Sequence, residues 1–330
     1  MLSEFDLIRQ YFKRERAARA PHVPLGIGDD CALLAPTPGM QLAVSSDMLV
    51  EDRHFFAGAD ARMLGHKCLA VNLSDLAAMG ARPLGFTLAL ALPAANPAWL
   101  AAFSAGLFAL ADAHGCELIG GDTTKGPLNI CITIFGEISP GQALRRDAAR
   151  PGDDIWISGT LGDARLALAG YRKQCALSDT ELEAAGQRMH MPVPRVALGQ
   201  ALSSALPGQG DTLARAAIDI SDGLVGDLGH ILDASKVGAT LNVDLLPAGT
   251  ILARQPDNLR RRFTAAGGDD YELCFTAAPA RRAAIEAAAG ACATPVTRVG
   301  SIETRAGLRL VDAHGTPLDL QLTGFDHFAS

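Results

Sequence analysis

Apolar and polar positions along this 330-residue chain predict strands and helices that follow one another in turn. Short apolar or alternating runs, typical of strands, occur at residues 41–47, 85–92 and 130–138. Residues 118–124 predict a short strand that runs into a Gly-Gly-Asp turn at Gly120–Asp122. Apolar side chains recur at helical spacing over residues 5–16, 61–79 and 97–114, and Gly115 ends the last helix. This pattern predicts an α/β or α+β domain in the first half of the chain.

The Arg-Pro-Gly-Asp-Asp stretch ending at Asp154 is the best candidate for a domain boundary, because an apolar run follows this turn. We therefore expect an N-terminal α/β domain with a mixed sheet over residues 1–149 and a C-terminal α/β domain over 150–330. In the second domain, strands are expected at 155–158, 217–222, 239–245, 271–277 and 296–302. Helices are expected up to about residue 206, over 224–235 and over 279–289.

Composition narrows the class of protein. Apolar residues make up 48% and charged residues 20%, and the net charge is −7 with no long basic run. We therefore expect neither nucleic acid nor a membrane surface as a partner. Seven cysteines never occur as CxxC, no apolar run reaches the roughly 20 residues that span a bilayer, and the start lacks the basic region of a signal peptide. These features favour a cytoplasmic protein with reduced thiols.

Aspartates beside Gly or Ser recur at the ends of apolar stretches. Turn chemistry explains any one of them, but a whole set of acids favours sites for hard cations such as Mg²⁺. Asp75 belongs to this set, although it is the only charged residue between Lys67 and Arg82 on an otherwise apolar helix. The stretches are Gly28–Asp30, Ser45–Asp47, Asn72–Asp75, Gly120–Asp122, Asp219–Gly223 and Gly267–Asp270.

So many carboxylates would repel one another unless several cations lay among them, and such cations could bring two phosphorylated molecules together. ATP with a phosphorylated acceptor fits this requirement. Gly120 and Gly121 would let backbone N–H groups approach a phosphate, and Lys125 and Arg145–Arg146 supply nearby positive charge. The GxxxxGK[ST], GxGxxG and protein-kinase signatures do not occur.

Taken together, these stretches resemble the thiamine-monophosphate kinase family, within the superfamily of aminoimidazole ribonucleotide synthetase and selenophosphate synthetase. The resemblance covers essentially the whole chain, with the motifs in the family's order. They are GIGDDCALL (26–34), SSDMLVEDRHF (45–55), HKCLAVNLSDLAAMGARP (66–83), IGGDTTKG (119–126), ISGTLGDA (157–164), IDISDGLVGDLGHI (218–231), GGDDYELCF (267–275) and GFDHF (324–328).

The resemblance implies transfer of the ATP γ-phosphoryl group to thiamine phosphate, several Mg²⁺ ions, a homodimer with contacts in the N-terminal domain, and an active site between two α/β domains. Implied metal ligands are Asp30, Ser45, Ser46, Asp47, Asp75, Asp122, Asp219 and Asp222. Implied ATP contacts are Gly121, Asp122, Arg146 and Ser221, and implied thiamine phosphate contacts are His54, Asp269 and Phe325.

Some assignments stay open at this point. Asp29 could replace Asp30, and the roles of Asp269 and Asp270 are not separated. The family often has Glu at the position of Asp269 and Trp or Tyr at that of Phe325. Since a phosphate acceptor is already ionised, we expect direct in-line transfer with no general base. The alternatives are a sister synthetase that forms a phosphorylated intermediate and a non-catalytic Mg-ATP-binding scaffold.

Overall fold

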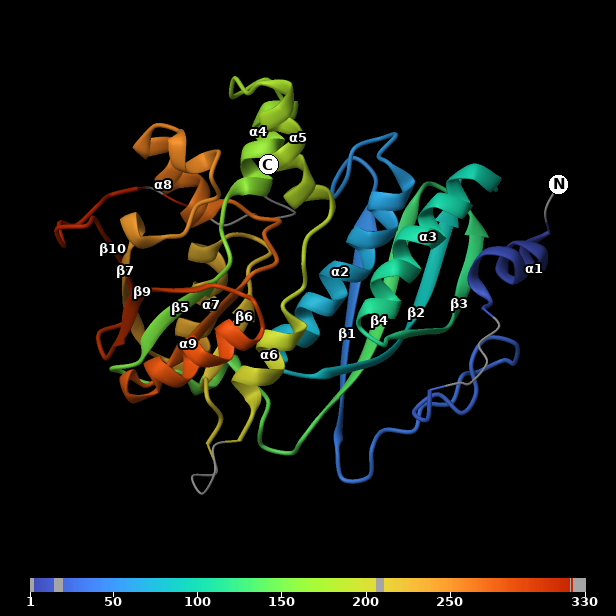
Figure 1. Cartoon of the computed structure of the whole chain (residues 1–330), viewed down its shortest axis with the longest axis horizontal. Coiled ribbons are helices and arrows are strands. Elements are labelled where there is room, and N and C mark those ends of the chain that lie inside the picture. The colour runs from blue at the N-terminus through green and yellow to red at the C-terminus, as the bar shows by residue number, and fades with distance from the viewer. Residues whose placement is uncertain (1–2, 15–19, 206–210, 321, 323–330) are drawn as a thin grey trace. The chain divides into compact units, whose positions relative to one another are not determined.

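The computed structural model describes residues 3–14, 20–205, 211–320 and 322. The chain divides into two compact units, of which unit 1 is residues 1–76 and 81–141, and unit 2 is residues 77–80 and 142–330. The change of unit at residues 141–142 lies slightly before the boundary expected at residues 149–150. Both units combine a mixed sheet with helices (Figure 1), as the sequence predicted.

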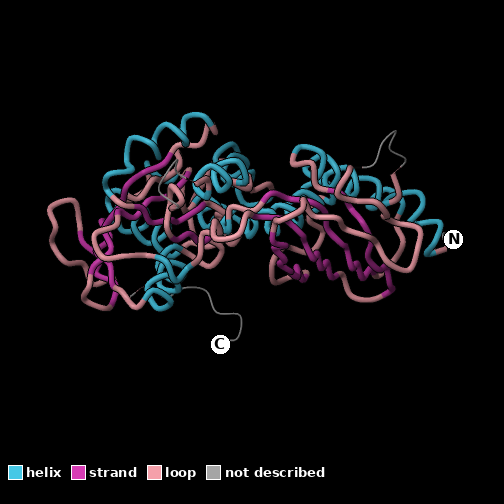
Figure 2. Tube along the Cα trace, turned by 90° about the horizontal axis from the view of Figure 1, so that it is seen from below, coloured by secondary structure: helices cyan, strands magenta, loops and turns pink. Residues whose placement is uncertain are grey.

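Unit 1 is built on a four-stranded sheet in the order β1-β4-β2-β3, in which only β2 and β3 run parallel among the described residues. Helices α2 and α3 lie on one face of this sheet (Figure 2). The chain begins with the short α1 and a π-helical turn at Ile8–Phe12, in place of the longer helix expected there. The elements are α1 (Glu4–Leu7), β1 (Gln41–Val50), α2 (Ala61–Met79), β2 (Arg82–Leu92), α3 (Pro97–Ala113), β3 (Glu117–Lys125) and β4 (Asn129–Ile138).

The core of unit 1 lies between this sheet and its two helices. Ile130, Ile132 and Ile134 alternate along β4 and are almost fully buried, because every second side chain of a strand faces the same way. Leu73 of α2 and Phe103 of α3 are also fully buried. On the opposite face of the sheet, Leu42, Val44 and Met48 of β1 are 46%, 57% and 54% exposed.

Unit 2 contains a six-stranded sheet in the order β10-β7-β9-β5-β8-β6. Only the β10–β7 pair is parallel in the described part of this sheet. Its strands are β5 (Asp154–Ser158), β6 (Ala216–Asp219), β7 (Gly238–Asn242), β8 (Leu273–Ala277), β9 (Val296–Glu303) and β10 (Gly307–Val311). Its helices are α4 (Asp163–Tyr171), α5 (Asp179–His190), α6 (Val196–Ser203), α7 (Leu224–Ser235), α8 (Asp257–Ala266) and α9 (Arg282–Ala291).

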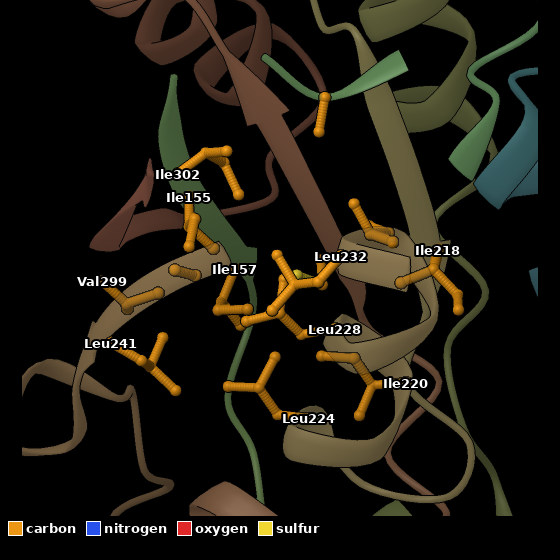
Figure 3. Packing of buried hydrophobic residues seen from close by; sticks show 14 of the residues in the cluster. Ile155, Ile157, Ile218, Ile220, Leu224, Leu228, Leu232, Leu241, Val299 and Ile302 are labelled. Carbon is orange, nitrogen blue, oxygen red and sulfur yellow. The ribbon is translucent and has the colours of Figure 1, made fainter. Parts of the chain in front are cut away.

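Helix α7 supplies the apolar stripe that closes the core of unit 2. Leu224, Leu228 and Leu232 recur at intervals of four residues and face Ile157 of β5 and Ile218 of β6 (Figure 3). The sequence predicted α2 and α7 with their observed bounds. It did not predict α8, which has three consecutive arginines, or β10, which lies at the edge of its sheet.

Two strand predictions need correction. Ser45–Asp47 and Gly120–Asp122 were expected where strands end, but the former lies inside β1 and the latter inside β3. The cross-strand hydrogen bonds continue through both stretches, so polar and glycine residues do not end these strands. Their side chains are therefore displayed on the faces of the sheet instead of on loops.

Buried Glu137 of β4 joins the segment that precedes β1 to the sheet. Its carboxylate accepts hydrogen bonds from the Thr37 backbone N–H at 2.8 Å, the Thr37 hydroxyl at 2.9 Å and Arg82 Nε at 3.1 Å. Burial opposes the charged form of Glu137, but the Thr37 and Arg82 contacts favour it more strongly and lower its pKa.

A Glu137→Gln variant tests this contribution. A carboxylate whose pKa is lowered by folding stabilises the protein above its unfolded pKa, near 4.5, and loses this effect as pH falls through the folded value. We expect the variant to lose about 1–3 kcal/mol of unfolding free energy at pH 7 and progressively less below pH 4.5. Urea unfolding at several pH values measures this difference, and exposed Glu183→Gln is the control. A deficit that does not change with pH would contradict the assignment.

Candidate active site

The residues predicted to bind ligands fall into separate groups within the two units. The first group, the Asp47–Asp75 pair, lies between β1 and α2. Ser45 Oγ donates a hydrogen bond to the Asp75 carboxylate, and Asp47 packs against the same carboxylate. Burial, followed by the charge of Asp75 and the hydrogen bond with it, raises the pKa of Asp47 to about 7.

Ser46 points to the other face of β1. Its hydroxyl lies 3.0 Å from Thr133 Oγ1 and donates to the Ile132 carbonyl oxygen at 3.2 Å. Alternation along the strand therefore separates the Ser46 hydroxyl from the side chains of Ser45 and Asp47.

His54 lies in the turn that follows β1. Its Nδ1 accepts a hydrogen bond from the Val50 N–H at 2.9 Å, which fixes the imidazole against the end of the strand. The buried ammonium group of Lys67 donates to the His54 carbonyl oxygen at 3.4 Å. His54 and Lys67 are thus connected where β1 approaches α2.

The second group lines a pocket of about 920 Å³ at the β3 edge of unit 1. Asp29 and Asp30 lie along this pocket together with Asp122, although more than 90 residues separate them in the sequence. Arg9 and Lys13 add two cationic side chains, which the sequence reasoning did not identify. The sequence offered little reason to expect Arg9 and Lys13 in a binding site, because it does not indicate where this short N-terminal segment lies in the fold.

Gly121 allows the backbone of β3 to lie close to the backbone of β2. Its φ is +145°, and a Cβ atom there would lie 1.9 Å from the Leu88 carbonyl oxygen. Asp122 pairs with Ala89 of β2, Ala89 pairs with Cys131 of β4, and Cys131 pairs with Met48 of β1. Since directly paired residues share a face, Asp122 lies on the face of the sheet opposite to Asp47.

The third group lies in unit 2, where β6 turns into α7. Asp219 is buried, whereas Ser221 and Asp222 are half-buried. The N–H groups of Asp222 and Gly223 donate to Asp227 Oδ2 at 3.2 and 3.1 Å, so Asp227 fixes the turn from the first turn of α7. Burial and the charge of Asp222 raise the pKa of Asp227 to about 7.

The structure distinguishes two neighbouring acids that the sequence left open. Asp270 is buried, and its Oδ2 accepts a hydrogen bond from the Gly162 N–H at 2.8 Å, while Asp269 is half-exposed. Burial raises the pKa of Asp270 well above its usual range. Accessibility therefore favours Asp269 as the ligand contact.

Glu272 has a structural role that sequence reasoning missed. It is fully buried and accepts hydrogen bonds at 2.6 Å from Ser158 Oγ, Arg188 Nη2 and Arg195 Nε. Paired guanidinium groups offset the cost of burying its charge. Through Glu272, the residue before β8, the network joins β5, α5 and the residue before α6.

Of the two remaining predicted site residues, Arg146 lies within the described residues and Phe325 does not. The Arg146 side chain is exposed, and its carbonyl oxygen accepts a hydrogen bond from Ser235 Oγ at 2.7 Å, whereas Arg145 is paired with Asp147. Phe325 lies outside the described residues.

Within the described ranges, no group of three or more His, Cys, Asp or Glu side chains is arranged to hold a metal ion. The described helices also include none that is both long and apolar enough to cross a membrane.

The fold and these motifs define the class of the protein. Residues 28–138 match the N-terminal domain, and residues 150–313 the C-terminal domain, of AIR synthase related proteins. The chain therefore belongs to the AIR synthase related proteins, with both of their domains in order.

Comparison with individual relatives narrows the class. The chain is 45% identical to the thiamine-monophosphate kinase of Salmonella typhimurium and 44% identical to that of Escherichia coli K12, each over 99% of this chain and 98% of the relative. Within the AIR synthase related proteins, the chain thus belongs to the thiamine-monophosphate kinase family and is an enzyme. The resemblance inferred from the ordered motifs is confirmed.

Solved structures agree with this placement. The thiamine-monophosphate kinase of Stenotrophomonas maltophilia K279a is 46% identical and matches with a TM-score of 0.82 over 90% of this chain and 93% of that one. AaThiL complexed with AMPPCP and TMP is 26% identical and matches with a TM-score of 0.75 over 89% of each chain. The expected two-domain α/β architecture is confirmed.

A pair of glycine variants tests the local geometry of β3. Gly121→Ala places a methyl group against the Leu88 carbonyl oxygen, so we expect it to lose about 2 kcal/mol or more of unfolding free energy. Gly120→Ala is the matched control, because its Cβ would lie 3.8 Å from Thr87 Cγ2 in ordinary contact. Urea denaturation of both variants measures the difference, and equal stability would show that β3 can leave β2 at little cost.

Proposed function

We propose that this enzyme transfers the γ-phosphoryl group of ATP to thiamine phosphate, which yields thiamine diphosphate and ADP. The full-length relationship to thiamine-monophosphate kinases carries the proposal, and the likeness to AaThiL complexed with AMPPCP and TMP supports both ligands. The assigned ATP contacts are Gly121, Asp122, Arg146 and Ser221. The assigned thiamine phosphate contacts are His54, Asp269 and Phe325.

The donor groups in both units are suited to Mg²⁺. Asp47 and Asp75 lie together, and burial and the charge of Asp75 raise the pKa of Asp47. A bound cation would offset the repulsion between the two carboxylates. Mg²⁺ is commonly held by one or two carboxylates, with phosphates and water completing its ligand shell. The residues proposed to hold Mg²⁺ are Asp30, Ser45, Ser46, Asp47, Asp75, Asp122, Asp219 and Asp222. Ser46 and Asp122 face away from the Asp47–Asp75 pair, so they would hold a separate ion.

When bound, Mg²⁺ supplies positive charge that offsets the repulsion between two phosphate-bearing substrates. Two unit charges at roughly 4 Å repel by on the order of 4 kcal/mol at an effective dielectric of 20, so this neutralisation is needed. Gly121 lines the pocket, and its lack of a side chain lets β3 approach Leu88 of β2 closely. The exposed guanidinium group of Arg146 is proposed to contact ATP. Its neighbour Arg145 is less suited to this role, because it is paired with Asp147.

The chemical step needs no proton acceptor from the protein. The attacking atom is an oxygen of the thiamine phosphate group, which is already ionised near neutral pH. It attacks the γ-phosphorus in line with the departing ADP, without a phosphoenzyme, and the enzyme contributes positioning and charge stabilisation.

A coupled assay for ADP tests the function. We expect ADP formation with ATP, Mg²⁺ and thiamine phosphate, and none above background when thiamine replaces thiamine phosphate.

Asp75→Asn removes one charge of the Asp47–Asp75 pair and should lower kcat by on the order of a hundredfold. Asp112→Asn is the control, because Asp112 lies on α3 in an exposed ion pair with Arg14. Near-normal turnover of Asp75→Asn would count against the metal assignment, and absence of turnover in the natural protein would refute the function.

We further propose a homodimer that buries the exposed face of β1. Val44 and Met48 are more than half exposed on this face, and Phe135 of β4 pairs with Val44. Exposed apolar patches on a folded surface commonly mark contacts with another protein. A second copy is the proposed occupant, because the same patch on each copy can meet across a two-fold axis.

The oligomeric state of two valine variants tests the homodimer. Val44→Glu places a charge on the proposed contact and should convert the protein to a monomer in sedimentation velocity. Val193→Glu is the matched control, because Val193 is 47% exposed in unit 2, and it should remain dimeric. A dimer that persists in Val44→Glu would place the contact elsewhere, and a monomeric natural protein would exclude it.

A further inference from the structure

The loop Gly267–Tyr271 has an unusual backbone conformation. Asp269 and Tyr271 have φ angles of +71° and +52°, in the left-handed region that side-chain-bearing residues rarely adopt. Each such residue costs on the order of 1 kcal/mol or more and persists only where the surrounding structure imposes it. The contacts of this loop show how the conformation is imposed.

Backbone hydrogen bonds hold the loop against the turn after β6. The Asp269 N–H donates to the Ser221 carbonyl oxygen and the Tyr271 N–H to the Ile220 carbonyl oxygen, each at 2.8 Å. Gly268 allows this approach, because a Cβ atom there would lie 2.5 Å from the Ser221 carbonyl oxygen. The loop is thus fixed to the segment that carries Ser221 and Asp222.

Side chains on both sides of Tyr271 anchor the same loop to other elements. Buried Asp270 accepts its hydrogen bond from the Gly162 N–H, before α4, at 2.8 Å. Fully buried Glu272 is held by Ser158, Arg188 and Arg195. The backbone on both sides of Tyr271 therefore has little freedom to move.

From this fixed position, the Tyr271 hydroxyl donates a hydrogen bond to Asp269 Oδ1 at 3.1 Å. A tyrosine hydroxyl can donate one hydrogen bond, and an ionised carboxylate can only accept one. The bond restricts the torsions of the half-exposed Asp269 side chain.

We propose that Tyr271 is a positioning residue that orients the Asp269 carboxylate toward thiamine phosphate. The inference rests on the proposed function, since it takes Asp269 as a substrate contact. Tyr271 acts through Asp269 and not on the reacting phosphates. Its loss should therefore weaken binding of thiamine phosphate while leaving the transfer step and ATP binding nearly unchanged.

Tyr271→Phe tests the proposal, because it removes the hydroxyl and keeps the ring. We expect KM for thiamine phosphate to rise about tenfold, the effect of losing one hydrogen bond to a charged group. We expect kcat, KM for ATP and the melting temperature to stay close to those of the natural protein. Tyr171→Phe is the matched control: Tyr171 is 38% exposed in the same unit, its hydroxyl lies 3.1 Å from His190 Nε2, and its loss should change none of these values.

A double-mutant cycle shows whether Tyr271 acts through Asp269. In an Asp269→Ala background, Tyr271→Phe should have no further effect on KM for thiamine phosphate, because the carboxylate that it orients is gone. Equal effects in both backgrounds would overturn the proposal, as would an unchanged KM in Tyr271→Phe. A parallel loss of kcat, ATP affinity and melting temperature would assign Tyr271 a purely structural role and also overturn it. Each result requires turnover of thiamine phosphate by the natural protein, so failure of the proposed function is recognised separately.

Discussion

A carboxylate removed from water must be hydrogen-bonded, paired with a cation or protonated, and this constraint organises both units. In unit 2 the donors come from the fold itself: Glu272 is held by Ser158 and two arginines, and Asp270 by a backbone N–H. In unit 1, Asp47 lies against another acid, Asp75. Glu272 and Asp270 therefore stabilise the fold of unit 2, whereas the Asp47–Asp75 pair of unit 1 is suited to an added cation.

The alternation of side chains along β1 lets this strand contribute to two different surfaces. Successive side chains of β1 face opposite ways, so Ser45 and Asp47 face α2 while Val44 and Met48 are exposed. A shift of one residue in register would bury the apolar set and expose the acids. The long pairing of β1 with β4, from residue 41 to residue 50, holds this register.

Much of the fold could be predicted from local pattern. Helices α2 and α7 were predicted with their observed bounds, because their apolar residues recur at strong helical spacing. Helix α8 was missed because its three consecutive arginines obscure a narrow apolar side that includes Phe263. Gly120–Asp122 was read as a turn, since glycine usually interrupts strands, yet pairing with β2 carries β3 through it.

The sequence by itself determined the family and the kind of chemistry, because ordered motifs and residue types are properties of the chain alone. Only the tertiary structure decided which acids lie together and which of two neighbours is accessible. Buried Asp270 is hydrogen-bonded to Gly162, 108 residues away, and Asp122 lies along the same pocket as Asp29 and Asp30. Burial and hydrogen bonding depend on such distant partners, and local sequence pattern carries little information about them.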